Sequence, residues 1–127
     1  MKKAITTSEA PQALGAYSQA VKVGKTIYCS GQIGLNPQTG NFISEEVTEQ
    51  AKQALKNLKA VLAKANFKVN DIVKVTIFMT RISDFDKINK VYTEFFKETE
   101  VLPARSAIGV LALPGGALVE IEAIAKK

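Results

Sequence analysis

The fold is decided by the stretch IVKVTIFMT, residues 72–80, which lies between two segments of helical periodicity. Side chains alternate between the two faces of a β-strand, so this pattern predicts a strand with apolar residues on both faces. One face is expected to carry Ile72 and Phe78, and the other Val73, Val75, Ile77 and Met79. Because an apolar face left in water is a liability, a second copy of the chain is expected to cover it.

Helices are predicted on both sides of this strand. Apolar residues recur every three or four positions over residues 45–65, and Ser44 is the expected N-cap. The same spacing over residues 84–97 predicts a second helix, where Ser83 and Asp86 resemble a capping box. Each helix carries one apolar stripe, which favours packing on one face of a sheet.

Five further segments alternate in the manner of strands. They are residues 4–7, 20–23, 26–30, 105–111 and 118–125. Gly24-Lys25 is expected to turn the second into the third, and Pro114-Gly115-Gly116 is expected to form a hairpin between the last two. The order β-β-β-α-β-α-β-β predicts a single α+β domain over residues 1–127, with both helices on one face of a mixed sheet of about six strands.

Absent residue types narrow the possible chemistry. The 127 residues contain no histidine and one cysteine, Cys29, for which a buried and inert thiol is expected. A Ser-His-Asp or Cys-His triad and a zinc site of the usual type are therefore excluded, and we expect no metal. No glycine-rich loop fits a nucleotide-binding fingerprint. Any catalysis must use carboxylate, hydroxyl, guanidinium and backbone groups.

Charge and hydropathy bear on location and partners. No apolar run reaches the roughly 18 residues of a membrane span. A secretory signal is not recognisable and one cysteine cannot form an internal disulfide, so the cytoplasm is expected. The net charge of +5 permits a nucleic-acid partner. However, the lysines are scattered and the only arginines are Arg81 and Arg105, which favours a solvated lysine-rich surface over a nucleic-acid groove.

Arg105 and Glu120 are the first candidates for chemistry. A guanidinium can grip a carboxylate through two parallel hydrogen bonds, and Arg105 opens an apolar strand directly after Pro103-Ala104. A surface salt bridge is the alternative interpretation. Glu120 shares one strand face with Glu122. Either one of these carboxyl groups handles protons in a pocket, or both form a solvent-facing row.

Four other residues are candidates with less specific surroundings. Tyr17 and Ser30 lie in short polar clusters at strand ends, and Gly31 would let the backbone approach a ligand closely. A tight turn is the alternative at each of them. Asn89 lies on the apolar edge of the second predicted helix, where its amide either caps a loop or orients a ligand.

Together these segments resemble the Rid family of reactive intermediate deaminases, also called the YjgF type. The motifs that carry the resemblance are Gly15-Ala16-Tyr17-Ser18-Gln19-Ala20, Ser30-Gly31-Gln32-Ile33, the strand 73–80, Ser83-Asp84-Phe85 with Asn89 and Val91-Tyr92, Pro103-Ala104-Arg105-Ser106, and Val119-Glu120-Ile121-Glu122-Ala123. The match runs over residues 4–125, and the last two motifs are its most specific part. One departure is Ala107, where the family often has a cysteine.

The resemblance implies a chorismate-mutase-like fold, a homotrimeric barrel and ligand clefts between subunits. It implies hydrolysis of enamines and imines of the 2-aminoacrylate and 2-iminobutyrate type to 2-keto acids and ammonia, without a cofactor. The residues implied are Glu120, Tyr17 and Ser30 as catalytic, and Arg105, Asn89, Gly31 and Ala107 as substrate-binding. Members also carry the labels translation initiation inhibitor and endoribonuclease L-PSP, so an RNA-directed function is one alternative. A non-catalytic metabolite-binding protein on the same fold is another.

Overall fold

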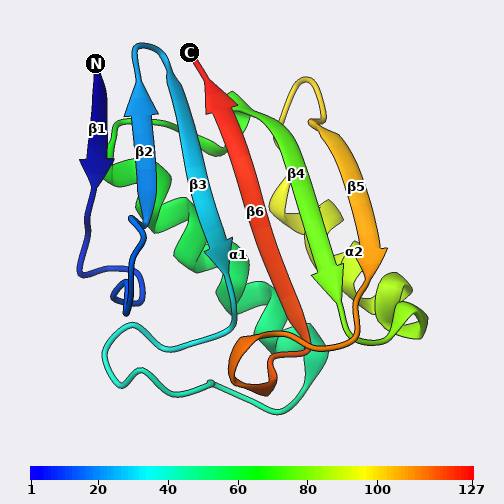
Figure 1. Ribbon diagram of the computed structural model, residues 1–127. Helices are drawn as coiled ribbons and strands as arrows, with labels where there is room; N and C mark the ends of the chain where they lie inside the picture. The colour runs from blue at the N-terminus through cyan, green and yellow to red at the C-terminus, as the bar shows by residue number, and fades with distance from the viewer.

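One mixed sheet and two α-helices make up the computed structural model, which describes residues 1–127 (Figure 1). The strands are β1 (Lys2–Ile5), β2 (Ala20–Val23), β3 (Thr26–Gln32), β4 (Ile72–Met79), β5 (Ala104–Gly109) and β6 (Val119–Lys126). The helices are α1 (Val47–Lys64) and α2 (Phe85–Phe95). Across the six-stranded sheet the order is β1-β2-β3-β6-β4-β5. The predicted α+β class and the alternation of six strands with two helices are confirmed.

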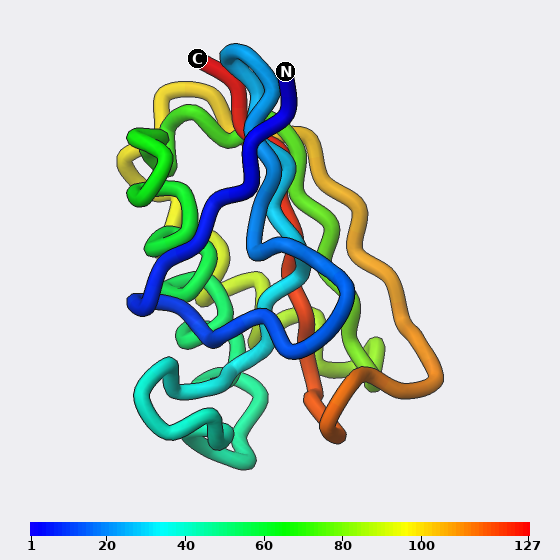
Figure 2. The backbone as a smooth tube through the Cα atoms, turned by 60° about the vertical axis from the view of Figure 1, so that its left-hand side comes forward, coloured from blue at the N-terminus to red at the C-terminus, as the bar shows by residue number.

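Both helices lie on one face of the sheet, as predicted, and no helix covers the opposite face (Figure 2). The core forms between the two layers. Leu55, Leu58 and Leu62 of α1 are almost fully buried there, as are Val75 and Ile77 of β4. The apolar stripe of the helix and the alternate residues of the strand thus meet, because burial of both surfaces is the main favourable term in folding.

The first hairpin forms where the sequence predicts it. Val23 pairs with Thr26 around the Gly24-Lys25 turn, and Gly24 adopts a positive φ of 58°. Strand β1 lies slightly earlier in the chain than the predicted 4–7, because its register places Ile5 opposite Ala20 on the buried face.

Strand β6 occupies a position that local patterns do not reveal. β5 pairs with β4 in parallel, whereas β6 pairs antiparallel with both β3 and β4. The predicted hairpin between 105–111 and 118–125 is therefore wrong, because β4 separates the two strands. Pro114–Gly116 is a 3-10 turn within the loop that connects them. By inserting between β3 and β4, β6 completes the backbone hydrogen bonds of two strands at once, which outweighs the pairing of sequence neighbours.

A β-bulge near the start of β4 reverses the expected positions of its first two residues. Between the flanking pairs, β4 has one residue more than β6. Ile72 is consequently buried, with 2% of its surface exposed, whereas Val73 is 47% exposed. The prediction that Ile72 shares one strand face with Phe78 is wrong, because the extra residue shifts the alternation by one position.

The two predicted helix caps do not form. In α1 the N-cap position is held by Glu46, whose side chain makes no capping bond. The Ser44 hydroxyl instead accepts a hydrogen bond from the Glu46 N–H at 3.0 Å, which closes a turn before the helix. α2 continues directly from the 3-10 turn Ile82–Asp84, so Ser83 and Asp86 form no capping box. A preceding helical turn removes the need for such a cap.

A buried glutamine of α1 holds the loop that precedes β6. Gln50 is 4% exposed; its side-chain oxygen accepts a hydrogen bond from the Leu118 N–H at 2.9 Å, and its amide nitrogen donates to the Ser44 carbonyl at 3.0 Å. Leu118 lies two residues before Glu120. This clamp therefore helps to fix the point at which β6 begins.

Replacing Gln50 by leucine is expected to lower the free energy of unfolding by roughly 1–3 kcal/mol, because two partly buried backbone groups lose their hydrogen-bond partner. Urea unfolding measures this change. The control is Lys52→Ala on the same helix, which removes an exposed ion pair with Glu49 and should change stability by less than about 1 kcal/mol. A loss in Gln50→Leu no larger than that of the control would contradict the clamp.

Candidate functional site

Arg105 is the second residue of β5, and three side chains of α2 hold its guanidinium. Nη1 donates a hydrogen bond to Oδ1 of Asn89 at 2.7 Å. The guanidinium carbon lies 4.7 Å from the ring centre of Tyr92 and 5.3 Å from that of Phe85. Positions 85, 89 and 92 share one helix face, which explains why all three meet the same group.

No carboxylate neutralises Arg105. The ion pairs of the structure join Lys52 to Glu49 and Lys97 to Glu94. The surface salt bridge that was the alternative interpretation of Arg105 is therefore not formed. Its side chain stays exposed, so the remaining guanidinium N–H groups are available to an anion in a fork geometry.

A cavity of about 650 Å³ adjoins this guanidinium. Asn89 and Tyr92 line it from α2, and Leu102 and Pro103 line it from the segment before β5. Its wall contains a lysine and the arginine but no aspartate or glutamate. Such a lining favours a ligand that is anionic at one end and apolar at the other.

Phe85 and Tyr92 are contacts of Arg105 that no sequence pattern had indicated, because apolar residues at this spacing are typical of the core-facing stripe of a helix. Tyr92 is 5% exposed, and its hydroxyl has no hydrogen-bond partner. Burial raises the pKa of this phenol, and the charge of Arg105 lowers that pKa in part. The available signal was spacing: Phe85 lies one turn before Asn89 and Tyr92 nearly one turn after it.

The role of the Tyr92 ring can be separated from that of its hydroxyl. Tyr92→Phe is expected to leave the free energy of unfolding within about 1 kcal/mol of the original, because no hydrogen bond is lost. Tyr92→Leu should lower it by roughly 1–3 kcal/mol, because packing and the cation–π contact both disappear. Thermal unfolding of the two variants measures the difference. Equal stability of both would show that the ring does not support the guanidinium.

Glu120 is the second residue of β6 and is half-buried. Burial raises the pKa of its carboxyl group, and the charge of Glu122, on the same strand face, raises it further. The side chain lies over Gly31: a Cβ built there would stand 2.8 Å from Cδ and 2.9 Å from Cγ of Glu120. A raised pKa makes the ionised carboxylate a better proton acceptor, which suits this group to proton transfer.

Ser30 and Tyr17 lie in neighbouring segments but bond to other groups. The Ser30 hydroxyl donates to the Ser18 carbonyl at 2.6 Å, and the Tyr17 N–H donates to the Gly15 carbonyl at 3.0 Å. The Tyr17 ring is 55% exposed at the edge of a cavity of about 510 Å³ formed by the N-terminal loops. Neither side chain is hydrogen-bonded to Arg105 or Glu120 within one chain.

Arg105 and Glu120 lie on opposite faces of the sheet. Arg105 pairs with Val75 of β4, and Glu120 pairs with Phe78. Paired residues point to the same face, and positions 75 and 78 of an unbroken strand point to opposite ones. Val75 is fully buried beneath the helices. Ala107 pairs with Ile77 and so lies on the helix side with Arg105. One copy of the chain therefore does not bring the guanidinium and the carboxyl group together.

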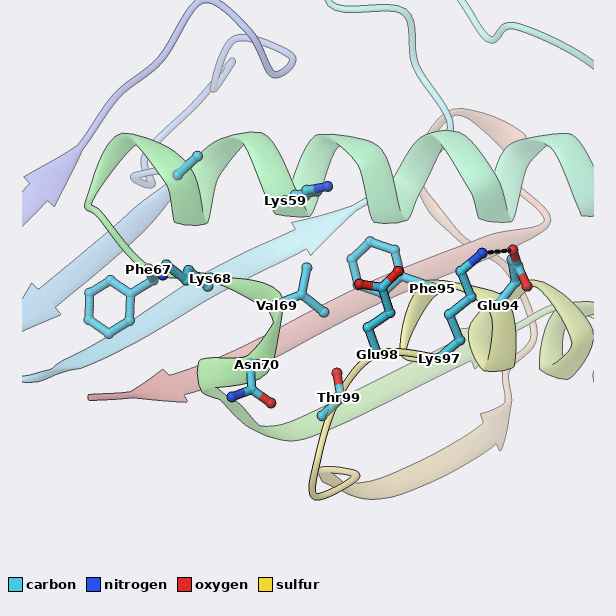
Figure 3. A pocket seen from close by; sticks show the side chains of 11 residues that line it. Lys59, Phe67, Lys68, Val69, Asn70, Glu94, Phe95, Lys97, Glu98 and Thr99 are labelled. Carbon is cyan, nitrogen blue, oxygen red and sulfur yellow. Dashed lines mark hydrogen bonds and ion pairs between the residues drawn. The ribbon is translucent and has the colours of Figure 1, made fainter.

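Another cavity, of about 670 Å³, lies between the second half of α1 and the end of α2 (Figure 3). Lys59, Lys68 and Glu98 contribute charges to its wall, together with the ion pair of Lys97 and Glu94. None of the candidate residues lines this cavity. Its mixed charges favour no single class of ligand.

Outside the candidate site, the structure bears on the predicted thiol, on metal binding and on membrane insertion. Cys29 is buried, and burial raises the pKa of its thiol to about 12, which makes the thiolate scarce at neutral pH. No three histidine, cysteine, aspartate or glutamate residues lie close enough together to hold a metal ion. Neither helix has the length and apolar character required to cross a membrane.

Comparisons with known proteins identify the family. Residues 7–127 match the sequence profile described as endoribonuclease L-PSP. The 2-iminobutanoate/2-iminopropanoate deaminase of Mus musculus is 49% identical over 125 residues, covering 98% of this chain and 91% of the mouse protein. YyfA of Yersinia pestis, a protein of the Rid family, has a TM-score of 0.97 and 46% identity over the whole of both chains. E. coli TdcF, solved with bound serine, has a TM-score of 0.94 and 44% identity over 98% of each chain.

The chain is similar to these proteins both in sequence, including the quoted motifs, and in fold. The profile covers nearly the entire chain, and the two matched structures superpose on nearly all of it at 44% and 46% identity. The resemblance carried by the Pro103–Ser106 and Val119–Ala123 motifs is confirmed. The chain belongs to the Rid family, the family described as endoribonuclease L-PSP.

Proposed function

We propose that this protein is a hydrolytic deaminase of reactive enamines and imines of the 2-aminoacrylate and 2-iminobutyrate type. The observation that carries the proposal is the Arg105 guanidinium, which α2 holds in place while no carboxylate of the chain neutralises it. Such a group suits a small substrate with a carboxylate. The mouse relative, at 49% identity, is named as a deaminase of 2-iminobutanoate and 2-iminopropanoate.

The reaction adds water across the C=N bond of an imine; an enamine first becomes that imine when a proton leaves its nitrogen and another adds to its terminal carbon. Water bonds to the imine carbon, the carbinolamine collapses, and ammonia leaves with the proton that its nitrogen requires, so that a 2-keto acid remains. Arg105 binds the substrate carboxylate through two N–H groups, with Asn89 fixing the guanidinium. The Glu120 carboxyl group activates the water and later protonates the leaving nitrogen. Tyr17 and Ser30 order the water, and Gly31 and Ala107 line the site.

The proposed roles of Arg105 and Glu120 require more than one subunit. Arg105 and Glu120 face opposite sides of the sheet, so a neighbouring copy has to supply one of them. The face without helices exposes 51% of Tyr28 and 43% of Ile108, which a second copy would cover. We propose a cyclic homotrimer with its sites between subunits. The proposed reaction needs no cofactor, and a lone buried thiol is consistent with the cytoplasm as its compartment.

The direct test is a coupled assay in which a dehydratase generates 2-aminoacrylate or 2-iminobutyrate in place. The protein is expected to accelerate the release of ammonia and keto acid well above the rate in buffer. Release at the solvent rate over a range of protein concentrations would overturn the proposal. Saturable binding of 2-ketobutyrate without turnover would instead favour the metabolite-binding alternative.

The shared site has a quantitative test of its own. Arg105→Ala and Glu120→Gln subunits, each inactive alone, are mixed in equal amounts and assembled together. If one subunit gives Arg105 and its neighbour gives Glu120, random assembly restores about one quarter of the original activity. No recovery in verified mixed trimers would show that both groups act from the same chain.

The family description as an endoribonuclease keeps an RNA-directed function as a second candidate. The +5 charge permits such contacts. RNA cleavage that persists in Arg105→Ala and Glu120→Ala, and falls steeply with salt, would support a separate RNA activity. Cleavage that disappears on further purification would assign it to a contaminant.

A further inference from the structure

A β-bulge in β3 lies opposite Glu122 of β6, and its glycine, Gly31, lies against the side chain of Glu120. Cys29 pairs with Ala123 and Gln32 with Ile121. Two residues of β3, Ser30 and Gly31, therefore stand against the single residue Glu122 of β6 between these pairs. A bulge of this kind bends the strand locally and re-aims the groups next to it.

The Glu120 side chain fills the space above the bulged glycine. The three heavy atoms nearest to a Cβ built on Gly31 are all from this side chain: Oε2, Cδ and Cγ. Real Cβ atoms do not approach other atoms as closely as this construction requires. The carboxyl group therefore lies against the backbone of β3 at a distance that only glycine permits.

Backbone conformation does not explain the glycine. The glycines with positive φ are Gly15, Gly24, Gly40, Gly115 and Gly116. Gly31 is not among them, so an L-residue could adopt its φ without strain. A side chain at position 31 fits only if the Glu120 side chain moves away from the place that it occupies here.

We propose that Gly31 is a positioning residue: by lacking a Cβ it gives the Glu120 carboxyl group a fixed place against the backbone of β3, and so sets where that group stands relative to the substrate. The inference rests on the proposed function only for its effect on turnover. The packing of Glu120 on Gly31 stands independently of the reaction, which allows separate tests.

A stability cycle tests the packing. Gly31→Ala is expected to lower the melting temperature by roughly 3–8 °C, because the added methyl group displaces the Glu120 side chain from its place against β3. In a Glu120→Ala background, which lacks all three clashing atoms, the same change should lower it by less than about 3 °C. Gly109→Ala is the matched control, because a Cβ there meets only ordinary contacts with Ile82 at 3.8 Å. If Gly31→Ala lowers the melting temperature as much in the Glu120→Ala background as in the unmodified protein, the proposal is overturned.

A titration tests the position of the carboxyl group without any assay of turnover. In the unmodified protein, burial raises the pKa of Glu120. Carbon-detected NMR of the labelled carboxyl group should show this pKa falling in Gly31→Ala, because the displaced group enters water. An unchanged pKa in folded Gly31→Ala would overturn the proposal. If that single variant does not fold, rescue of folding by the second change, Glu120→Ala, supports the proposal and failure of rescue overturns it.

Kinetics then separate positioning from substrate binding. Gly31→Ala is expected to lower kcat by about 10-fold or more while KM changes little, because Arg105 still holds the carboxylate. A rise in KM with unchanged kcat would show that Gly31 acts through substrate binding alone, the role that the family resemblance implies, and would overturn the positioning proposal. If the unmodified protein shows no turnover, the deaminase proposal fails while the stability cycle and the titration still decide the role of Gly31.

Discussion

Glu120→Gln is expected to lower kcat/KM for imine hydrolysis by about 10²–10⁴-fold, the usual contribution of a positioned general acid or base. Glutamine keeps the size of the side chain and can lie over Gly31 in the same way, so the fold should be retained. The coupled dehydratase assay measures the loss, and the melting temperature serves as the check on folding. Activity within a few-fold of the original would remove Glu120 from the mechanism.

The same residue sets the expected pH dependence. Burial and, secondarily, the charge of Glu122 raise the pKa of Glu120. Because the ionised form activates water, activity should decline as the pH falls through this raised pKa, and so above the range of an ordinary glutamate. Glu122→Gln removes the like charge and should move this decline to lower pH while kcat is largely kept. A pH profile that does not move in Glu122→Gln would contradict this assignment.

Arg105→Lys is expected to be nearly as damaging as Arg105→Ala, with a loss of about 10²-fold or more in kcat/KM. Lysine keeps the positive charge but loses the two-point grip on a carboxylate and the planar group that stacks on Tyr92 and Phe85. Binding of 2-ketobutyrate, measured by calorimetry, should weaken in parallel.

The other arginine provides the matched control. Arg81→Lys changes an exposed side chain outside the candidate residues and should leave kcat/KM within about two-fold. Retention of most activity in Arg105→Lys would show that charge alone suffices and that the geometry of the guanidinium is unimportant.

Several elements of the fold could be predicted because they depend on neighbours in the chain. The β2–β3 hairpin follows from Gly24-Lys25, and both helices follow from the three-to-four residue spacing of their apolar positions. Asn89 accepts a hydrogen bond from Arg105, a partner that neither of its two predicted roles, capping a loop or orienting a ligand, had named. Phe85 and Tyr92 were missed because an apolar stripe does not distinguish core residues from residues that stack on a guanidinium.

Pairing between strands that are distant in the chain accounts for the structural features that the local sequence patterns did not predict. The position of β6 between β3 and β4, the bulge that exposes Val73 and the bulge that brings Gly31 beneath Glu120 all depend on which strands meet and in which register. A shift of one residue in register reverses the face of every side chain that follows, and the sequence of one strand does not contain that register.

The sequence by itself determined the family, the helices, most strands and the identity of the candidate groups, because motifs and periodicity are properties of the chain. Only the tertiary structure decided that Arg105 and Glu120 face opposite sides of one sheet, and that a carboxyl group lies on the glycine of a bulge. The physical reason is that the face on which a side chain lies, and how closely it approaches another strand, are fixed by hydrogen-bond registers between strands distant in the chain.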